Sequence, residues 1–413
     1  MSSPIRSAPF ARPGARAVYL TMEVTAALAG QLAFIIAPLY RIRTAHLTPA
    51  QLVLVGTCME AAVFLCEVPT GVVADVISRR LSIIIGHIGM GLALVAEGLV
   101  ASVTVSIAAQ VAWGASYTFT SGATQAWLAG EVGDGTETLT PLFLRVSRVS
   151  QVASIVAVPV SFALGSIALR IPLLVGGGVS VALGLWLIVV MPETGFDRTP
   201  AEQRSTWHQM RSTTRDGVRA VRASAALMLI ALLASVSGGS SEAYDRLWEA
   251  QLLHVGLPHV LGLGQLPWFA LLSMVSSGAG IVLTRYVERR GPGRDRERVT
   301  RWLLVLFPAQ VIGLLLFGLA GSFAMAAVAT IVVERTRRLQ APLVAAWVIP
   351  ITPRAERATV LSALGQSDAI GQVVLGPVLG VVASRLGLPA AIVTSAVVLA
   401  PGWFVLRAAR RAR

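Results

Sequence analysis

The stretch EVPTGVVADVISRR, from Glu67 to Arg80, decides the fold of this chain. It places a glycine, an aspartate and two arginines between two long apolar runs, so charge lies directly beside sequence suited to a membrane. Gly71 permits close approach of another backbone, and Pro69 relaxes the helix where a moving element can bend. Asp75 falls where a helix is expected to leave the bilayer. The stretch therefore predicts a helix border at a membrane surface.

The composition also indicates a membrane protein. Hydrophobic residues make up 55% of the chain, charged residues only 13%, and the mean hydropathy is +0.71. A soluble domain has about a quarter of its residues charged. The net charge of +13 arises from arginine alone, because none of the 34 basic residues is lysine. The placement of these arginines, described below, argues against a nucleic-acid partner.

Twelve stretches are long enough to cross a hydrocarbon core of roughly 30 Å, which requires about 20 helical residues. The expected spans are 17–41, 50–74, 81–102, 105–131, 145–169, 171–191, 225–253, 266–286, 301–320, 322–350, 357–383 and 389–407. The tenth is the most polar, because ERTRR at 334–338 interrupts its apolar run. No cleavable signal peptide is expected, since the first 16 residues are polar and rich in arginine. The chain is predicted to be an all-α polytopic membrane protein.

The distribution of arginine predicts the orientation of these spans. Cytoplasmic segments of membrane proteins carry an excess of arginine and lysine. With both termini in the cytoplasm, most arginines fall on the cytoplasmic side. Four are then expected outside, Arg41, Arg43, Arg170 and Arg385, and four within the membrane, Arg246, Arg335, Arg337 and Arg338. The expected location is the cell membrane, with an even number of spans.

A long polar segment divides the chain into two halves of six spans. The predicted units are an N-terminal bundle at 1–191, a cytoplasmic linker at 192–224 and a C-terminal bundle at 225–413. The spacing of arginines in the linker favours an amphipathic helix on the membrane surface. GIVLTRYVERR at 280–290 occupies the same place in the second half as 71–80 does in the first. The two bundles are therefore expected to be pseudo-symmetric.

The order of Gly71, Asp75, Arg79 and Arg80 resembles the GxxxDxxGRR loop between helices 2 and 3 of the major facilitator superfamily (MFS) of transporters, with Ser78 in place of the glycine. The resemblance covers almost the whole chain. It implies 12 transmembrane helices in two six-helix bundles, a monomer, and a gate formed by these residues together with Glu67. In that gate, Asp75 is expected to lie against the partly positive N-terminus of span 11, near 355–361. Arg79 or Arg80 is expected to bind acidic groups or carbonyls of the N-terminal bundle.

A second element, ATVLSALGQSDAIGQVVLGPVLG at 358–380, adds a helix-packing motif formed by Gly376, Pro377 and Gly380. These glycines thin one helix face, and the proline permits bending. The element resembles a motif of the 12-span drug and proton antiporters, where it is expected on span 5. Here span 5 carries only Pro159, and Gln110 replaces an arginine expected on span 4. If that arginine helps to couple protons in the family, coupling here uses other groups.

Charged groups inside lipid are costly and are usually functional. The carboxylates considered for proton coupling are Glu23, Glu60, Glu242, Asp245 and Asp368. Glu242 and Arg246 lie four residues apart on one helix face and can neutralise each other, whereas Asp245 and Glu249 cannot. One of that second pair needs a proton or a partner elsewhere. An alternative is that the cluster forms an outer gate salt bridge.

Polar and aromatic residues on the expected cavity-lining spans are candidates for substrate binding. They are Gln31, Gln110, Trp113, Tyr117, Gln125, Arg246, Glu334, Arg335 and Arg338. Trp113 and Tyr117 recur at helical spacing on span 4, which suits a flat organic molecule, although a helix-packing stripe has the same pattern. Glu334 can pair with Arg338, and Arg335 or Arg337 can reach Asp368. That network is alternatively structural.

These features predict a proton-driven exporter of hydrophobic or cationic small molecules. Its partners would be the substrate, protons and the lipid bilayer, with no cofactor and no metal. The first alternative is a proton-coupled importer of a sugar or organic acid that uses Arg246, Arg335 and Arg338. A membrane receptor without transport is a further alternative. No enzyme is expected, because the chain has no HExxH sequence, no paired aspartates with glycine and no cysteine–histidine cluster.

Overall fold

A computed structural model of the chain describes residues 14–132, 136–195, 219, 221–222, 224–258, 265–289, 296–348, 351–352 and 357–411. These residues form helices and no strands. The helices of the first half are α1 (Ala15–Phe34), α2 (Ala37–Arg43), α3 (Pro49–Val76), α4 (Arg79–Leu99), α5 (Val103–Thr118), α6 (Ala123–Val132), α7 (Thr136–Ile167) and α8 (Arg170–Val190). Those of the second half are α10 (Ala225–Val255), α11 (Gln265–Arg289), α12 (Arg296–Gly318), α13 (Phe323–Val348), α14 (Arg357–Leu386), α15 (Leu388–Leu399) and α16 (Gly402–Arg411).

Ten segments of the described chain are long and apolar enough to cross a membrane. Two predicted spans are not among them, and each has a local reason. Span 105–131 breaks into α5 and α6 at residues 119–122, where Gly122 adopts a positive φ of 73°. Span 322–350 forms the continuous helix α13, but four charged residues between 334 and 338 reduce its hydropathy. With the α5–α6 pair and α13 added, the described helices account for the twelve predicted spans.

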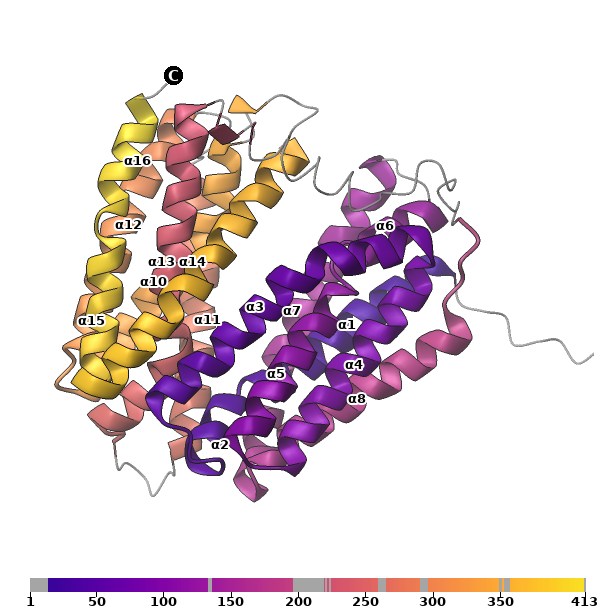
Figure 1. Cartoon of the computed structure of the whole chain (residues 1–413), viewed down its shortest axis with the longest axis horizontal. Coiled ribbons are helices and arrows are strands. Elements are labelled where there is room, and N and C mark those ends of the chain that lie inside the picture. The colour runs from indigo at the N-terminus through magenta and orange to yellow at the C-terminus, as the bar shows by residue number, and fades with distance from the viewer. Residues whose placement is uncertain are drawn as a thin grey trace, which may run out of the picture.

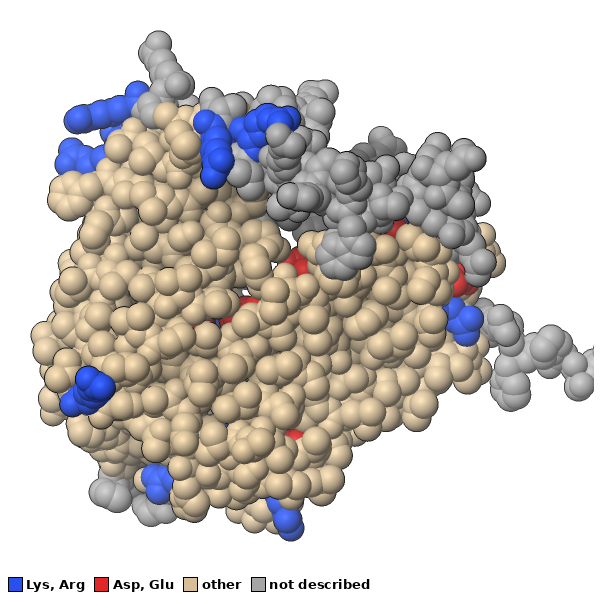
Figure 2. All heavy atoms as spheres, in the orientation of Figure 1, with Lys and Arg blue, Asp and Glu red and all other residues tan. Residues whose placement is uncertain are grey.

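The helices α1–α8 pack into one bundle and α10–α16 into another (Figure 1). We call the end of the molecule where α1 begins and α16 ends the terminal face. In Figure 1 the bundles diverge towards the terminal face and meet at the opposite face, near α2 and the start of α15. Figure 2 shows acidic side chains inside the seam between the bundles. The predicted surface helix at 192–224 falls mostly outside the described residues.

Small residues set the distance between neighbouring helices within the N-terminal bundle. A Cβ atom on Gly177 of α8 would lie only 2.7 Å from the carbonyl oxygen of Gly91 on α4, and the reverse contact would be 2.5 Å. The two backbones therefore touch. Because lipid gives no hydrophobic drive for helices to associate, such close van der Waals packing is a main source of their association.

The contact between the bundles is formed mainly by α3 and α14. Gly376 of the predicted helix-packing motif lies against the side chain of Thr57, and Gly380 lies against Ala50 and Val53. Pro377 sits between them inside α14. Around this crossing, side chains from both bundles form one apolar cluster. It contains Leu47, Leu52, Val53, Val55, Ala243, Leu247, Leu379, Ala383 and Ala391.

Candidate functional site

A cavity of about 340 Å³ lies within the N-terminal bundle, among α1, α4, α5, α6 and α8. We call it the aromatic cavity. It is lined by Glu23, Ala26, Ala29, Gly30, His87, Met90, Leu94, Trp113, Tyr117, Thr120, Ser121, Gly122, Thr124, Gln125 and Ser180. The break between α5 and α6 opens this space, because residues 119–122 turn away from the helix axis. Its volume is at the lower end of the range for small-molecule sites.

One wall of the aromatic cavity consists of Trp113 and Tyr117. They lie one turn apart on α5, and their rings stack with centroids 5.5 Å apart and planes 8° from parallel. Phe34 packs edge-on against Trp113 with a centroid distance of 4.8 Å, which holds the indole in place. The stacked pair presents an aromatic surface to the cavity.

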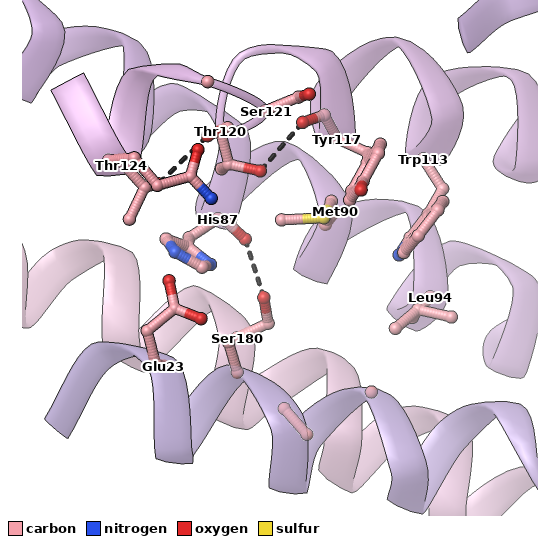
Figure 3. Close-up of a pocket in the computed structure, with 15 residues that line it drawn as sticks. Glu23, His87, Met90, Leu94, Trp113, Tyr117, Thr120, Ser121, Thr124 and Ser180 are labelled. Atoms are coloured by element: carbon pink, nitrogen blue, oxygen red, sulfur yellow. Dashed lines mark hydrogen bonds between the residues drawn. The ribbon is translucent and has the colours of Figure 1, made fainter. Parts of the chain in front are cut away.

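Glu23 and His87 face each other across the aromatic cavity (Figure 3). Glu23 is partly buried on α1, whereas His87 on α4 is only 5% exposed. The His87 backbone carbonyl accepts a hydrogen bond of 2.9 Å from the hydroxyl of Ser180. Its ring nitrogen Nδ1 has no hydrogen-bond partner among the described residues. The sequence analysis missed His87, although a histidine within the apolar run SIIIGHIGMG is the signal that identifies it.

A second cavity, of about 1160 Å³, lies between the bundles. We call it the arginine cavity. Its walls come from α1, α6 and α7 on one side and from α11 and α13 on the other. Four arginines line it: Arg148, Arg285, Arg335 and Arg338. The predicted residue Gln31 also lines this cavity, and Glu23 and Gln125 line both. Glu23 is therefore placed where the two cavities adjoin.

Arg246 of α10 joins the two bundles through carboxylates. Its Nη2 lies 3.3 Å from Oε1 of Glu60 on α3, and its Nε lies 3.6 Å from Oε2 of Glu242 one turn earlier on α10. The pairing of Glu242 with Arg246 agrees with the sequence analysis. Glu60 is not a lone carboxylate, because the arginine reaches it from the other bundle. Arg246 lines neither cavity described above.

Gly56 makes room for the Arg246 guanidinium, since a Cβ atom there would overlap its Nε, Cζ and Cδ atoms. We therefore expect Gly56→Ala to move Arg246 off Glu60 and to weaken the contact between the bundles. Cross-linking or distance measurements between labels on α3 and α10 would then show a population with the bundles further apart. Gly30→Ala is the matched control, since a Cβ atom there meets no atom within 4 Å. An unchanged distance distribution in Gly56→Ala would contradict the expectation.

Several other charges of the C-terminal bundle are paired within it, whereas Glu249 is 3% exposed and its Oε2 has no hydrogen-bond partner among the described residues. Arg337 binds Asp245 with both of its terminal nitrogens, and its Nη2 lies 2.8 Å from Oδ2. Glu334 lies 3.6 Å from Arg338, as expected, and 3.5 Å from Arg335. No ion pair joins an arginine of span 10 to Asp368 among the described residues, since Arg337 is bound to Asp245. Asp368 instead accepts a hydrogen bond of 2.7 Å from Gln372 one turn away on α14.

Gln110 does not line either cavity, contrary to the sequence analysis. It is 2% exposed and donates a hydrogen bond of 2.9 Å to Glu97, because its face of α5 turns towards α4. Glu97 also accepts two hydrogen bonds from Arg41, of 2.7 and 3.0 Å. Arg41, which the arginine distribution assigns to the outer side, is only 6% exposed on α2. These three residues form a closed polar cluster near the end of the bundle opposite the terminal face.

The predicted gate lies at the border between α3 and α4. Asp75 is exposed and lies 3.7 Å from Arg79 one turn later. Arg79 donates to the carbonyl of Ala126 at 3.0 Å, and Arg80 donates to the carbonyl of Ile188 at 2.5 Å. Both arginines therefore bind carbonyls of the N-terminal bundle, as the loop sequence led us to expect. The predicted partner of Asp75, the start of span 11 near 355–361, is only partly within the described residues.

Ser78, which stands where the family motif has glycine, makes hydrogen bonds of its own at the start of α4. The Ser78 hydroxyl caps α4 by accepting from the Leu81 N–H at 2.9 Å, and it donates to Glu193 at 2.8 Å. Glu67, the first residue of the stretch, accepts a 2.9 Å hydrogen bond from Gln366 on α14. This contact crosses from one bundle to the other. Hydrogen bonds on both sides of the loop therefore hold Glu67, Ser78, Arg79 and Arg80 in place.

No protein-family model matches the sequence, and a comparison with curated proteins found no match. Solved structures do match. Nucleoside transporter NupG gives a TM-score of 0.76 at 14% identity, covering 97% of this chain and 100% of that one. A bacterial homologue of the human lysosomal transporter Spinster gives 0.69 at 16% identity, with 96% of each chain covered. The human organic anion transporter MFSD10 gives 0.60 at 16% identity, covering 95% and 100%.

These neighbours differ in what their names say they carry, but they share one arrangement of helices with this chain along nearly its whole length. At such low identity the likeness concerns the fold. Two six-crossing bundles joined at α3 and α14, with cavities inside and between them, agree with that arrangement. This chain has the fold of the major facilitator superfamily transporters.

Proposed function

We propose that this protein is a secondary active transporter that exports hydrophobic or cationic small molecules by alternating access, coupled to protons. The observation that carries the proposal is that the Glu23 carboxylate and the stacked rings of Trp113 and Tyr117 line the same cavity. An organic cation gains from a carboxylate and from aromatic faces, by roughly 2 kcal/mol or more per aromatic contact when water is excluded. Gln125 and Thr124 add hydrogen-bonding groups to the lining of this cavity.

The proposed orientation places the terminal face in the cytoplasm of the cell membrane. The arginine distribution supports this side, because cytoplasmic segments of membrane proteins are rich in arginine. The bundles diverge towards the terminal face and are closed at the opposite one. The structure would then be the inward-facing state, in which substrate enters from the cytoplasm. Separation of α3 from α14 at the opposite face would release it outside.

A second candidate is uptake or export of an organic anion. The observation that favours it is the cluster of Arg285, Arg335 and Arg338 on the arginine cavity. Arg335 is 11% exposed in its side chain, and its Nε has no hydrogen-bond partner among the described residues. An arginine of this kind suits a carboxylate or phosphate group, which it binds in a bidentate manner. Arg246, named for the same role from the sequence, is already bound by two carboxylates.

Replacement of Glu23 by glutamine tests the leading proposal. We expect Glu23→Gln to reduce transport of an aromatic cation such as ethidium by at least about tenfold, corresponding to about 1.4 kcal/mol, because the cation loses its counter-charge. Transport would be measured in inverted membrane vesicles energised by a proton gradient. Glu297→Gln is the control, since that carboxylate is exposed near the terminal face and lines neither cavity. Wild-type protein that moves aromatic carboxylates and no cation would replace the leading proposal by the second candidate.

A further inference from the structure

We propose that His87 holds a proton that is exchanged for a cationic ligand at Glu23, so that ligand binding and proton release take place in the aromatic cavity. The inference rests on the proposed function, and it assigns the proton to a residue outside the set considered from the sequence. Its starting point is the placement of Glu23 and His87 opposite each other (Figure 3). Among the described residues that line this cavity, they are the only two that can carry charge near neutral pH.

Among the described residues that line the aromatic cavity, Glu23 is the only one that can act as a counter-ion to His87. Tyr117 of α5, Thr124 and Gln125 of α6 and Ser180 of α8 also line it and carry no charge near neutral pH. The Ser180 hydroxyl is used on the His87 backbone carbonyl, not on its ring. The buried ring nitrogen Nδ1 is left without a partner among the described residues. Histidine is also the side chain whose charge changes most readily near neutral pH.

The charge balance of the cavity makes the exchange one for one. With His87 protonated, its positive charge neutralises Glu23 and the cavity is neutral overall. With an organic cation beside Glu23, the cavity is neutral only when the imidazole has lost its proton. Both positive charges together would leave one of them unpaired in a site of low dielectric, which is strongly unfavourable. The proton therefore leaves the imidazolium for water in the cavity as the cation binds, and returns when the cation leaves.

The other embedded carboxylates are less suited to this exchange, because they have partners or, like Glu249, do not line the aromatic cavity. Glu60 is bound to Arg246, Asp245 is bound to Arg337, and Asp368 is bound to Gln372. Protonation of Glu60 or Asp245 would leave an arginine without its counter-charge inside the protein. Glu23 has no such hydrogen bond or ion pair with any residue that the structure describes, and it shares a cavity with His87.

The test uses tetraphenylphosphonium, whose charge does not change with pH, so that any pH dependence of its binding comes from the protein. For the wild type in detergent, we expect affinity to fall from pH 8 to pH 5.5 by up to about tenfold per pH unit, the limit for one proton exchanged per ligand. In weakly buffered solution, about one proton should be released per ligand bound. His87→Gln is expected to bind tetraphenylphosphonium with an affinity that does not depend on pH, and to release no proton.

Glu23→Gln separates the two roles, because it should lose most of the binding at every pH. His254→Gln is the matched histidine control, since His254 is exposed in the last turn of α10 and should retain the wild-type pH dependence. His87→Asn serves if the glutamine variant fails to fold, which thermal unfolding reports. If neither folds, the wild-type proton release still decides the question, since release of no proton would overturn the inference.

Two outcomes distinguish a failure of this inference from a failure of the proposed function. If His87→Gln binds the cation but keeps the wild-type pH dependence and proton release, the role of His87 is overturned and the proposed function stands. If the wild type binds no tetraphenylphosphonium at any pH, the proposed substrate class fails and this inference fails with it.

Discussion

Replacement of Glu97 by alanine is expected to lower the free energy of unfolding by about 3–5 kcal/mol, because it leaves the Arg41 guanidinium buried without its counter-ion. Glu97 is fully buried and accepts hydrogen bonds from Arg41 on α2 and Gln110 on α5. The Tyr40 hydroxyl adds a 2.7 Å hydrogen bond to the Glu97 backbone carbonyl. Three helices therefore depend on one side chain. Thermal or denaturant unfolding in detergent measures the loss.

Two further variants identify the cause. Glu297→Ala removes one partner of an exposed ion pair with Arg410 and should change stability by less than about 1 kcal/mol. A double variant, Arg41→Met with Glu97→Met, replaces the buried pair by apolar side chains and should recover much of the lost stability. If the double variant is as unstable as Glu97→Ala, the unpaired arginine is not the reason for the loss.

The second large effect is expected in transport, from Asp75→Asn. In this structure Asp75 is exposed and only 3.7 Å from Arg79, so its charge adds little to stability and the variant should fold normally. In the opposite conformation, Asp75 would lie against the partly positive start of α14, an interaction worth up to about 2 kcal/mol. Loss of the Asp75 charge removes part of the free energy that stabilises the opposite conformation. We expect transport to fall by about tenfold.

The measurement compares transport in vesicles with thermal unfolding of the same preparations. Asp75→Glu keeps the charge and should retain most of the activity. Normal transport by Asp75→Asn would show that the loop between α3 and α4 is not part of the gate, whatever its resemblance to a known sequence. A fall in melting temperature equal to that of Glu97→Ala would show that the aspartate is instead structural.

The ion pairs of the C-terminal bundle show which side-chain contacts can be predicted from the sequence. The four-residue spacing of Glu242 and Arg246, and of Glu334 and Arg338, places each pair on one helix face, and both pairs are present. Partners on other helices were harder to predict. Asp245 and Arg337 are 92 residues apart, and nothing in either local sequence indicates their pairing. Spacing fixes neighbours within a helix, but it does not fix which faces of two helices meet.

Gln110 illustrates the same limit for the cavity. Its helical spacing from Trp113 and Tyr117 predicts that the three side chains share one face of α5. In the structure the Gln110 side chain instead turns to Glu97 on α4 and does not line the aromatic cavity. His87 is the reverse case, since its apolar neighbours suggest a packed helix face while the structure places it at a cavity wall. A small rotation of a helix about its axis decides whether a side chain faces a cavity or a neighbouring helix.

The sequence by itself determined the membrane class, the positions of the crossings and the division into two halves, because apolar length and arginine placement are local properties of the chain. The stretch from Glu67 to Arg80 also indicated the superfamily fold. Only the tertiary structure decided which embedded charges neutralise one another and which remain available. Glu23 and His87 line one cavity because α1 and α4 both pack against α6. That arrangement depends on the packing of whole helices, which sequence spacing does not encode.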